Sequence, residues 1–391
     1  MADKANLFAH MKCINECISR FGLEATVNVR NFQLEVRGRN RYFHMVPQYV
    51  YFDEGRMRYT PHLRSDSKLF LGWLPYFNKR WALAIDKLGF KEFCSVNNLR
   101  TPAYWLRADD SVRDFIVKQR ASSFGYGIRG PFRSIDPSDR RCRLAEDEYY
   151  EKFQTGKIAK IWYWNEKPVC LEMRDMPTVS GNGVQSLYEL MQARVGPGKT
   201  TPGRLEVDAL ASYQGLSLDE IVRSGRTVLA DFRYGSGLLP VSIEENLNAL
   251  PQRTDTRIGR QLVEAGPVFW NGIPEETRRT TLFTMDAIVD DEEQVWFLEM
   301  NCNPMGHPDV YFPMFESLFG PEQIPASDNL RSTLAPPPIP PGAMPAPLPG
   351  VAAFGAPVPA GQQFTPLGLP PGHAAPPPVA QQRPPRPPWW A

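Results

Sequence analysis

The sequence predicts an α+β protein of two or more lobes, followed by a proline-rich tail that we expect to be disordered. At 391 residues the chain exceeds the size at which a single hydrophobic core usually stops growing. Helix-like and strand-like patterns follow one another as far as about residue 320. From about residue 330 proline dominates the composition, and such a segment cannot bury a core.

Charge and composition exclude two classes of partner. The formal net charge is +1, with neither a basic block nor an acidic tail, which argues against an electrostatic surface for nucleic acid. No stretch approaches the roughly 20 apolar residues of a membrane helix, so we expect a soluble protein without a membrane partner. The six cysteines form no Cys-x-x-Cys pair, a pattern typical of reduced cysteines in a cytoplasmic protein.

Residues 1–81 are expected to form a small amino-terminal lobe. Apolar residues recur at helical spacing from residue 5 to residue 21, and Gly22 ends the run. Beyond residue 25 the period changes to two, which predicts short strands with polar turns between them. The predicted strands lie at residues 27–29, 34–36, 42–46 and 49–52, and residues 70–77 are expected to form the docking edge of the lobe.

A predicted hairpin near residue 290 brings three oxygen-bearing side chains together. Residues 283–289 form a strand that contains Asp286, and after an acidic turn a second strand leads to Glu299 and Asn301. Alternate strand residues share a face, so Glu299 and Asn301 project together with Asp286 beside them. Such oxygen ligands suit Mg²⁺. The alternative is that Asp286 caps a strand and residues 299–304 are only an exit turn.

A second candidate site combines a lysine with a loop of small residues. An amphipathic helix is predicted at residues 84–94, and a strand at residues 115–118 ends in Lys118. A strand that aims an ammonium group at free backbone N–H groups can cradle polyphosphate. An ordinary hairpin turn remains the alternative. The loop spans residues 121–128 and includes Ser123, Gly125 and Gly127.

Two further strands are predicted at residues 158–164 and 169–174, with a helix at residues 184–194. Arg174 ends the second strand, where it is either a functional cation or a solvated edge charge.

The order of these motifs resembles that of the ATP-grasp carboxylate–amine ligases. The branch that includes the ligase part of cyanophycin synthetase is the most similar in motif order, and glutathione synthetase and D-alanine–D-alanine ligase are more distant relatives. The likeness covers roughly residues 82–320. It rests on Asp86-Lys87 with Leu99-Arg100-Thr101-Pro102, on Val117-Lys118 with the loop, on Glu151-Lys152-Phe153-Gln154-Thr155-Gly156, on residues 174–183, and on Asp286 with residues 299–304.

The resemblance implies two α+β subdomains that clamp ATP, within a domain of residues 82–325. The tail predicted from composition is placed at residues 326–391. ATP and two Mg²⁺ ions, or Mn²⁺, are the implied cofactors. The implied roles are metal binding by Asp286, Glu299 and Asn301, phosphate contacts by Lys87 and Lys118, a phosphate-covering flap containing Ser123, Gly125 and Gly127, an adenine slot formed by Glu151, Lys152 and Phe153, and contact of Arg174 with an acyl-phosphate.

The chain departs from the family pattern on the acceptor side. Lys160 stands where an arginine is usual, and Asn182 replaces an aspartate. Residues 241–250 lack the glycine pair of this branch, and the family ending Asn-x-x-Pro-Gly is altered at residues 303–307. Substrate recognition is therefore not carried over from the family.

The reaction implied by the resemblance is ATP-dependent amide formation between a carboxylate and an amine, on an amino acid or a peptide. Two alternatives remain open: phosphoryl transfer to a hydroxyl, and a non-catalytic nucleotide-binding scaffold that displays the tail. The family also suggests a homodimer. The tail is either a passive spacer or a ligand for a partner that recognises polyproline.

Overall fold

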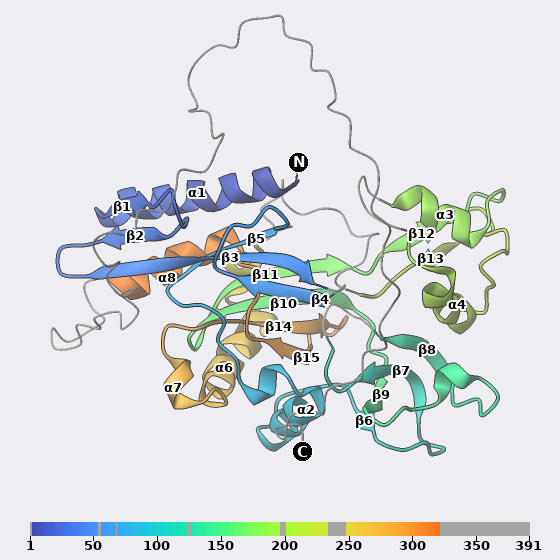
Figure 1. Ribbon diagram of the computed structural model, residues 1–391. Helices are drawn as coiled ribbons and strands as arrows, with labels where there is room; N and C mark the ends of the chain where they lie inside the picture. The colour runs from blue at the N-terminus through green and yellow to red at the C-terminus, as the bar shows by residue number, and fades with distance from the viewer. Residues whose placement is uncertain are drawn as a thin grey trace, which may run out of the picture. The chain divides into compact units, whose positions relative to one another are not determined.

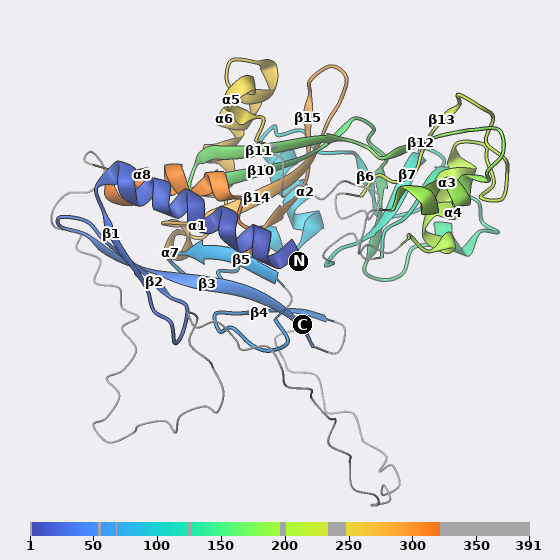
Figure 2. The ribbon, with the colours of Figure 1, turned by 90° about the horizontal axis from the view of Figure 1, so that it is seen from above.

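The computed structural model describes residues 2–53, 56–67, 69–122, 127–195, 201–233 and 248–320, which belong to one compact unit. Its elements are helices and antiparallel sheets (Figures 1 and 2), so the predicted α+β class is confirmed. The predicted flap residues Ser123 and Gly125 and the predicted tail lie outside the described residues. The predicted domain boundaries at residues 81 and 325 stay predictions.

The amino-terminal part of the chain begins with the expected helix, α1 (Ala2–Phe21). A sheet follows in the order β1-β2-β3-β4, with β5 paired to β3. The strands predicted at residues 42–46 and 49–52 are one strand, because β5 pairs with β3 across Pro47 and a bulge at Gln48. The strands are β1 (Glu24–Val27), β2 (Leu34–Arg37), β3 (Tyr42–Asp53), β4 (Arg56–Thr60) and β5 (Leu69–Leu74).

The central sheet is four-stranded and antiparallel, in the order β11-β10-β14-β15. Its strands are β10 (Lys157–Trp164), β11 (Lys167–Asp175), β14 (Leu282–Val289) and β15 (Val295–Asn301). Because strand residues alternate, Ala159, Ile161 and Tyr163 face one side, where they pack with α2 (Lys87–Val96) and α6 (Arg257–Asn271). Figure 1 shows both helices below this sheet.

The opposite face of the central sheet is apolar at both ends and polar in the middle. Trp162 and Leu282 pack at one end with α1 and α8 (Tyr311–Phe319), which contact each other (Figure 2). Ile158 and Ile288 form a separate small cluster at the other end. The positions between these clusters are occupied by charged side chains, and this polar belt is where the candidate site lies.

A second four-stranded sheet has the order β6-β9-β7-β8. Its core includes Phe115, Val117 and Tyr150, and Ala209 of α4 (Arg204–Tyr213) packs against it. The strand predicted at residues 115–118 is therefore confirmed as part of β7. The strands are β6 (Tyr104–Trp105), β7 (Arg113–Gln119), β8 (Arg129–Ser134) and β9 (Glu148–Lys152).

The remaining elements are short. The helix predicted at residues 184–194 is α3 (Leu187–Arg194), which begins at a capping box formed by Ser186 and Glu189. The others are β12 (Thr178–Ser180), β13 (Thr227–Leu229), α5 (Leu250–Arg253), α7 (Glu275–Arg278) and the 3₁₀ helices η1 (Ala82–Ala84), η2 (Arg140–Cys142) and η3 (Pro308–Val310).

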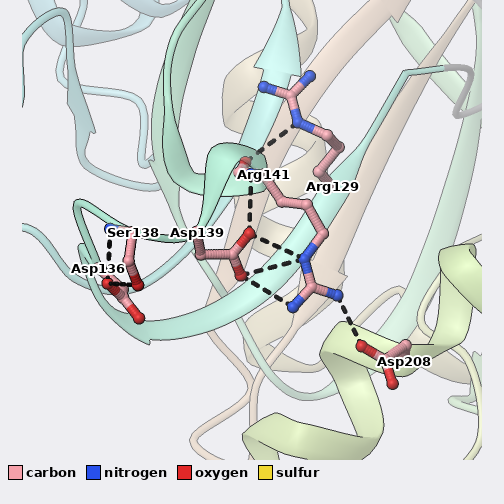
Figure 3. Close-up of polar contacts among 6 residues, drawn as sticks. All are labelled: Arg129, Asp136, Ser138, Asp139, Arg141 and Asp208. Atoms are coloured by element: carbon pink, nitrogen blue, oxygen red, sulfur yellow. Dashed lines mark hydrogen bonds and ion pairs between the residues drawn. The ribbon is translucent and has the colours of Figure 1, made fainter.

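An ion-pair network connects the second sheet to α4 (Figure 3). Arg141 contacts Asp208 of α4 at 2.7 Å and Asp139 at 2.8 Å. Arg129 of β8 donates from Nε to the Arg141 carbonyl at 3.1 Å, so the same segment is also held by its backbone. Arg129, Arg141 and Asp208 thus link β8 to α4, and Asp139 also contacts Arg141.

We expect Arg141→Ala to lower the free energy of unfolding by about 1 kcal/mol, because a partly exposed ion-pair network contributes only modestly. Chemical denaturation measures this loss, and hydrogen exchange should locate it in α4. The matched control is Arg140→Ala, which changes the exposed neighbouring arginine. Equal effects of the two substitutions would show that the network does not stabilise α4.

No helix within the described ranges is long and apolar enough to cross a membrane. All six cysteines lie in those ranges and are free thiols.

Candidate active site

The hairpin β14–β15 places the three predicted metal ligands side by side. Asp286 is paired with Glu299, and Thr284 with Asn301. Asn301 Nδ2 donates to Asp286 Oδ2 at 3.3 Å. Asp286 pairs with Glu299, but the next residue, Ala287, pairs with Phe297. Leu298 is therefore an extra, unpaired-in-register residue of β15. This bulge turns Glu299 away from the face occupied by Phe297 and towards Asp286.

Two lysines neutralise these carboxylates. Lys160 Nζ lies 2.7 Å from Asp286 Oδ1, and Lys87 Nζ lies 2.9 Å from Glu299 Oε2. Lys87 is the first residue of α2, whose N-cap is Asp86. The Lys87 amide donates to the Arg120 carbonyl and its ammonium donates to Ser122 at 2.9 Å, so the start of the helix is fixed to the end of β7.

A buried triad of charged side chains lies beside these two ion pairs. Glu151 of β9 contacts Lys91 of α2 at 2.6 Å and Lys118 of β7 at 3.3 Å, and all three side chains are almost completely buried. Lys91 also donates to Thr101 at 2.9 Å. The triad therefore joins the second sheet to α2, the helix that carries Lys87.

The pKa values show that the two charge clusters interact. Burial acts to raise the pKa of Glu299, but the charges of Lys87 and Lys118 outweigh burial and lower it to about 2. Burial acts to lower the pKa of Lys118, but Glu151 and Glu299 outweigh burial and raise it. Lys118 and Glu299 are thus electrostatic neighbours although they come from different sheets.

The pKa of Asp286 moves in the opposite direction. Burial raises it, Lys160 opposes burial, and the charge of Glu299 raises it further. Two adjacent carboxylates repel each other, and a divalent cation would relieve that repulsion.

The clusters together contain four lysines and three carboxylates, which leaves one positive charge in excess. A partly buried site with this charge attracts a polyanion.

The predicted adenine-slot residues separate in the structure. Glu151 lies with the lysines, whereas Lys152 contacts Asp114 at 3.2 Å. Phe153 packs against Tyr213 and Phe232, with ring centroids 5.5 and 5.1 Å away. The side chains of Lys152 and Phe153 therefore do not join the cluster formed by Lys87, Lys91, Lys118 and Lys160.

The backbone conformation explains why two predicted motif positions are glycine. Gly156 has a φ of +142°, and a Cβ there would lie 2.3 Å from the Val289 carbonyl oxygen of β14. Gly127 has a φ of +75°, and a Cβ there would lie 2.8 Å from the Gln119 side chain. At Gly156 a side chain would collide with the backbone of β14, whereas at Gly127 the positive φ is what favours glycine.

Arg174 lies on β11, two strands from Asp286. Its Nη2 is 2.9 Å from Glu172 Oε2, and both side chains are mostly buried, so it is not a solvated edge charge. Glu172 and Lys91 were not predicted. Lys91 had a detectable signal, because it lies four residues after Lys87 and shares its helix face with the buried Phe90 and Cys94. Glu172 had no such signal, because an alternating pattern does not distinguish a buried carboxylate from a solvated one.

This chain matches known proteins at low sequence identity. No family model matches the chain. The glutathione biosynthesis bifunctional protein of Clostridium perfringens (strain 13 / Type A) is 28% identical over 171 residues, which are 37% of this chain and 22% of that protein. The chain is similar to ATP-grasp ligases. The predicted ATP-grasp resemblance is confirmed in that sense, as a similarity.

Solved structures that match the chain include one described as an ATP-grasp ligase, 16% identical with a TM-score of 0.30. A bifunctional glutathione synthetase from Pasteurella multocida is 12% identical and has a TM-score of 0.35, with 80% of this chain and 43% of that chain covered. A D-alanine–D-alanine ligase from Bacillus anthracis, complexed with ATP, is 11% identical and has a TM-score of 0.28, with 61% and 62% covered. The chain thus spans less than half of the glutathione synthetase and about a fifth of the curated relative.

Proposed function

We propose that this chain is an ADP-forming ligase that joins a carboxylate to an amine through an acyl-phosphate. One observation supports this most directly: Lys87, Lys118 and Glu299, which are far apart in sequence, lie close together. Lysines around a pair of carboxylates suit a nucleotide polyphosphate and its metal ion. Packing alone does not favour so many buried charges in one place.

The residues on the hairpin fit Mg²⁺. Asp286, Glu299 and Asn301 supply hard oxygen ligands on neighbouring positions. The described residues hold no group of three or more His, Cys, Asp and Glu side chains that could bind a metal. Two carboxylates and an amide agree with that finding, because Mg²⁺ usually takes its remaining ligands from phosphate and water. Bound there, Mg²⁺ would neutralise charge on the transferring phosphoryl group.

The proposed reaction has two steps. A carboxylate oxygen of the substrate attacks the γ-phosphorus of ATP, and the bond from phosphorus to the bridging oxygen breaks to release ADP. The amine nitrogen then attacks the acyl carbon, the bond between that carbon and the phosphate oxygen breaks, and inorganic phosphate leaves with the electron pair. Of the two protons lost by the entering ammonium, one goes to phosphate and one to solvent. Lys87 and Lys118 hold the phosphates in line.

A screen for ADP release tests this proposal. We expect ADP and phosphate to form in equal amounts with at least one pair drawn from amino acids, dipeptides and small polyamines, and mass spectrometry should find an amide product. A phosphorylated hydroxyl product would favour phosphoryl transfer instead. Binding of ATP without ADP release from any pair would contradict the ligase proposal and favour the scaffold.

A further inference from the structure

Strand β1 forms an open edge of the amino-terminal sheet. Among the strands that the structure describes, β1 pairs with β2 alone, and its first three residues are exposed. Such an edge presents unpaired N–H and C=O groups to any second strand. Natural edges are commonly protected by charges along the strand, by proline or by a bulge. The β4 edge carries Arg56 and Arg58, whereas β1 has only Glu24, at its first position.

The hydrogen bonds to β2 determine which backbone groups of β1 point outwards. The Asn28 N–H donates to the Gln33 carbonyl at 2.8 Å, which continues the register of β1 and β2. Bonded and non-bonded pairs alternate along an antiparallel ladder. The residues two and four positions before Asn28 therefore bond to β2, whereas Ala25 and Val27 direct their N–H and C=O groups away from it. These two residues can bond to a further strand without losing a bond to β2.

Ala25 and Val27 also line an apolar cavity between the sheet and α1. Figure 1 shows β1 below α1, and the two elements border this cavity together. Met11 and Ala25 are both exposed in part, so the cavity opens between α1 and the free edge. Phe8, one turn before Met11, is 66% exposed. The cavity has a volume of about 180 Å³ and is lined by Met11, Ile14, Asn15, Ile18, Ala25, Val27, Leu34 and Trp73.

The sequence of β1 is complementary to itself in one antiparallel register. About a two-fold axis at Thr26, Ala25 of each copy bonds with Val27 of the other, which uses every outward-facing N–H and C=O group. A shift by two residues would leave one of these residues unpaired in each strand. Directly opposite residues share a face, so the Ala25–Val27 pairs lie on the cavity side and the two Thr26 side chains meet on the other. Glu24 lies opposite Asn28, so no like charges face each other.

The exposed face of α1 fits the same symmetry. The two-fold axis is perpendicular to the sheet, so both copies of α1 lie on one face of the joined sheet and run in opposite directions. Lys12 and Glu16 form an exposed ion pair at 4.0 Å on α1. An antiparallel second helix presents Glu16 towards Lys12 and Lys12 towards Glu16, so the charges of the two helices attract each other.

We propose that the β1 edge and the adjoining face of α1 form an interface with a second copy of this chain, through antiparallel pairing of β1 with β1. An identical chain fits better than an unrelated strand, because the outward-facing backbone groups, the side-chain pairs and the charges of α1 each match their own two-fold copies. The interface contains none of the residues assigned to the ligase site, so it does not depend on the proposed function.

Proline at position 25 tests the backbone hydrogen bonds. Ala25→Pro removes an outward-facing N–H but no bond to β2, and proline is tolerated at such positions of an edge strand. We expect sedimentation equilibrium to find a dimer of the full chain, and the variant to raise its dissociation constant about 10- to 100-fold, because one bond is lost from each copy. The matched control is Ala25→Ser, which keeps the N–H and should keep the dissociation constant close to that of the parent.

Opposite charges at position 26 test the two-fold axis. Lysine in both copies places like charges directly opposite each other, and so does glutamate. We expect Thr26→Lys and Thr26→Glu to raise the dissociation constant about 2- to 5-fold when each is alone, and an equimolar mixture of the two to restore association. Thr26 is exposed, so neither substitution disturbs the core.

A parent protein that stays monomeric at every concentration would overturn the proposal. A dimer that Ala25→Pro does not weaken, together with a mixture of the Thr26 variants that associates no better than either variant alone, would place the interface on another surface and would also overturn it. Thermal denaturation shows whether each variant is folded. If Ala25→Pro does not fold, the mixture of Thr26→Lys and Thr26→Glu decides the question.

Discussion

Glu299→Gln should reduce ADP release by roughly 100- to 1000-fold, the effect of removing one electrostatic group that acts on the transferring phosphate. The substitution keeps the shape of the side chain but removes the charge that pairs with Lys87 at 2.9 Å and that lies next to Asp286. A neutral amide would hold a hard cation such as Mg²⁺ more weakly than a carboxylate. Steady-state release of ADP, with the substrates found in the screen, measures the loss.

The control for Glu299→Gln is Glu292→Gln in the turn of the same hairpin, where the side chain is exposed. That variant should keep the activity of the parent protein. Thermal denaturation of both variants tests whether the fold is intact, since an amide oxygen can still accept a hydrogen bond from Lys87. Full activity in a folded Glu299→Gln variant would contradict the assignment of the hairpin.

Lys118→Ala should weaken ATP binding about 10- to 100-fold, because it removes a buried ammonium that would contact the phosphates. The loss of Lys118 leaves Glu151 paired with Lys91 at 2.6 Å, so the buried carboxylate keeps a counter-charge. Calorimetric titration with ATP measures the change. Lys167→Ala, at the exposed first residue of β11, is the matched control.

The double variant tests whether the two motifs act as one site. If Lys118 and Glu299 serve the same transition state, the double variant should be little slower than Glu299→Gln alone, because residues that act as a unit are not additive. If the fold-loss in rate of the double variant equals the product of the two single losses, the two residues belong to independent sites. Unchanged ATP affinity and turnover in Lys118→Ala would show that the assignment of β7 and the loop after it is wrong.

Much of the fold could be predicted from sequence periodicity. The hairpin of β14 and β15 followed from two apolar runs around an acidic turn, and α1 from its helical spacing. The α6 helix was not predicted, although it covers the central sheet, because no motif drew attention to it and Pro267 interrupts its pattern. The division of β3 into two strands was wrong, because Pro47 and a bulge lie inside one continuous strand.

The candidate site was only partly predictable. Asp286, Glu299 and Asn301 could be grouped by strand alternation, but the bulge at Leu298 that turns Glu299 towards Asp286 has no local sequence signal. The ion pairs of Lys87, Lys91 and Lys118 depend on how α2 and the second sheet meet the central sheet, which is a tertiary property.

Metal dependence of ATP binding tests the central claim most directly. If the lysines and the hairpin clamp one nucleotide with its metal ion, the parent protein should bind ATP more tightly with Mg²⁺ than with EDTA. Glu299→Gln should lose most of that difference, while Lys118→Ala should weaken binding under both conditions. An ATP affinity that is the same with Mg²⁺ and with EDTA, in the parent protein and in Glu299→Gln, would contradict the account.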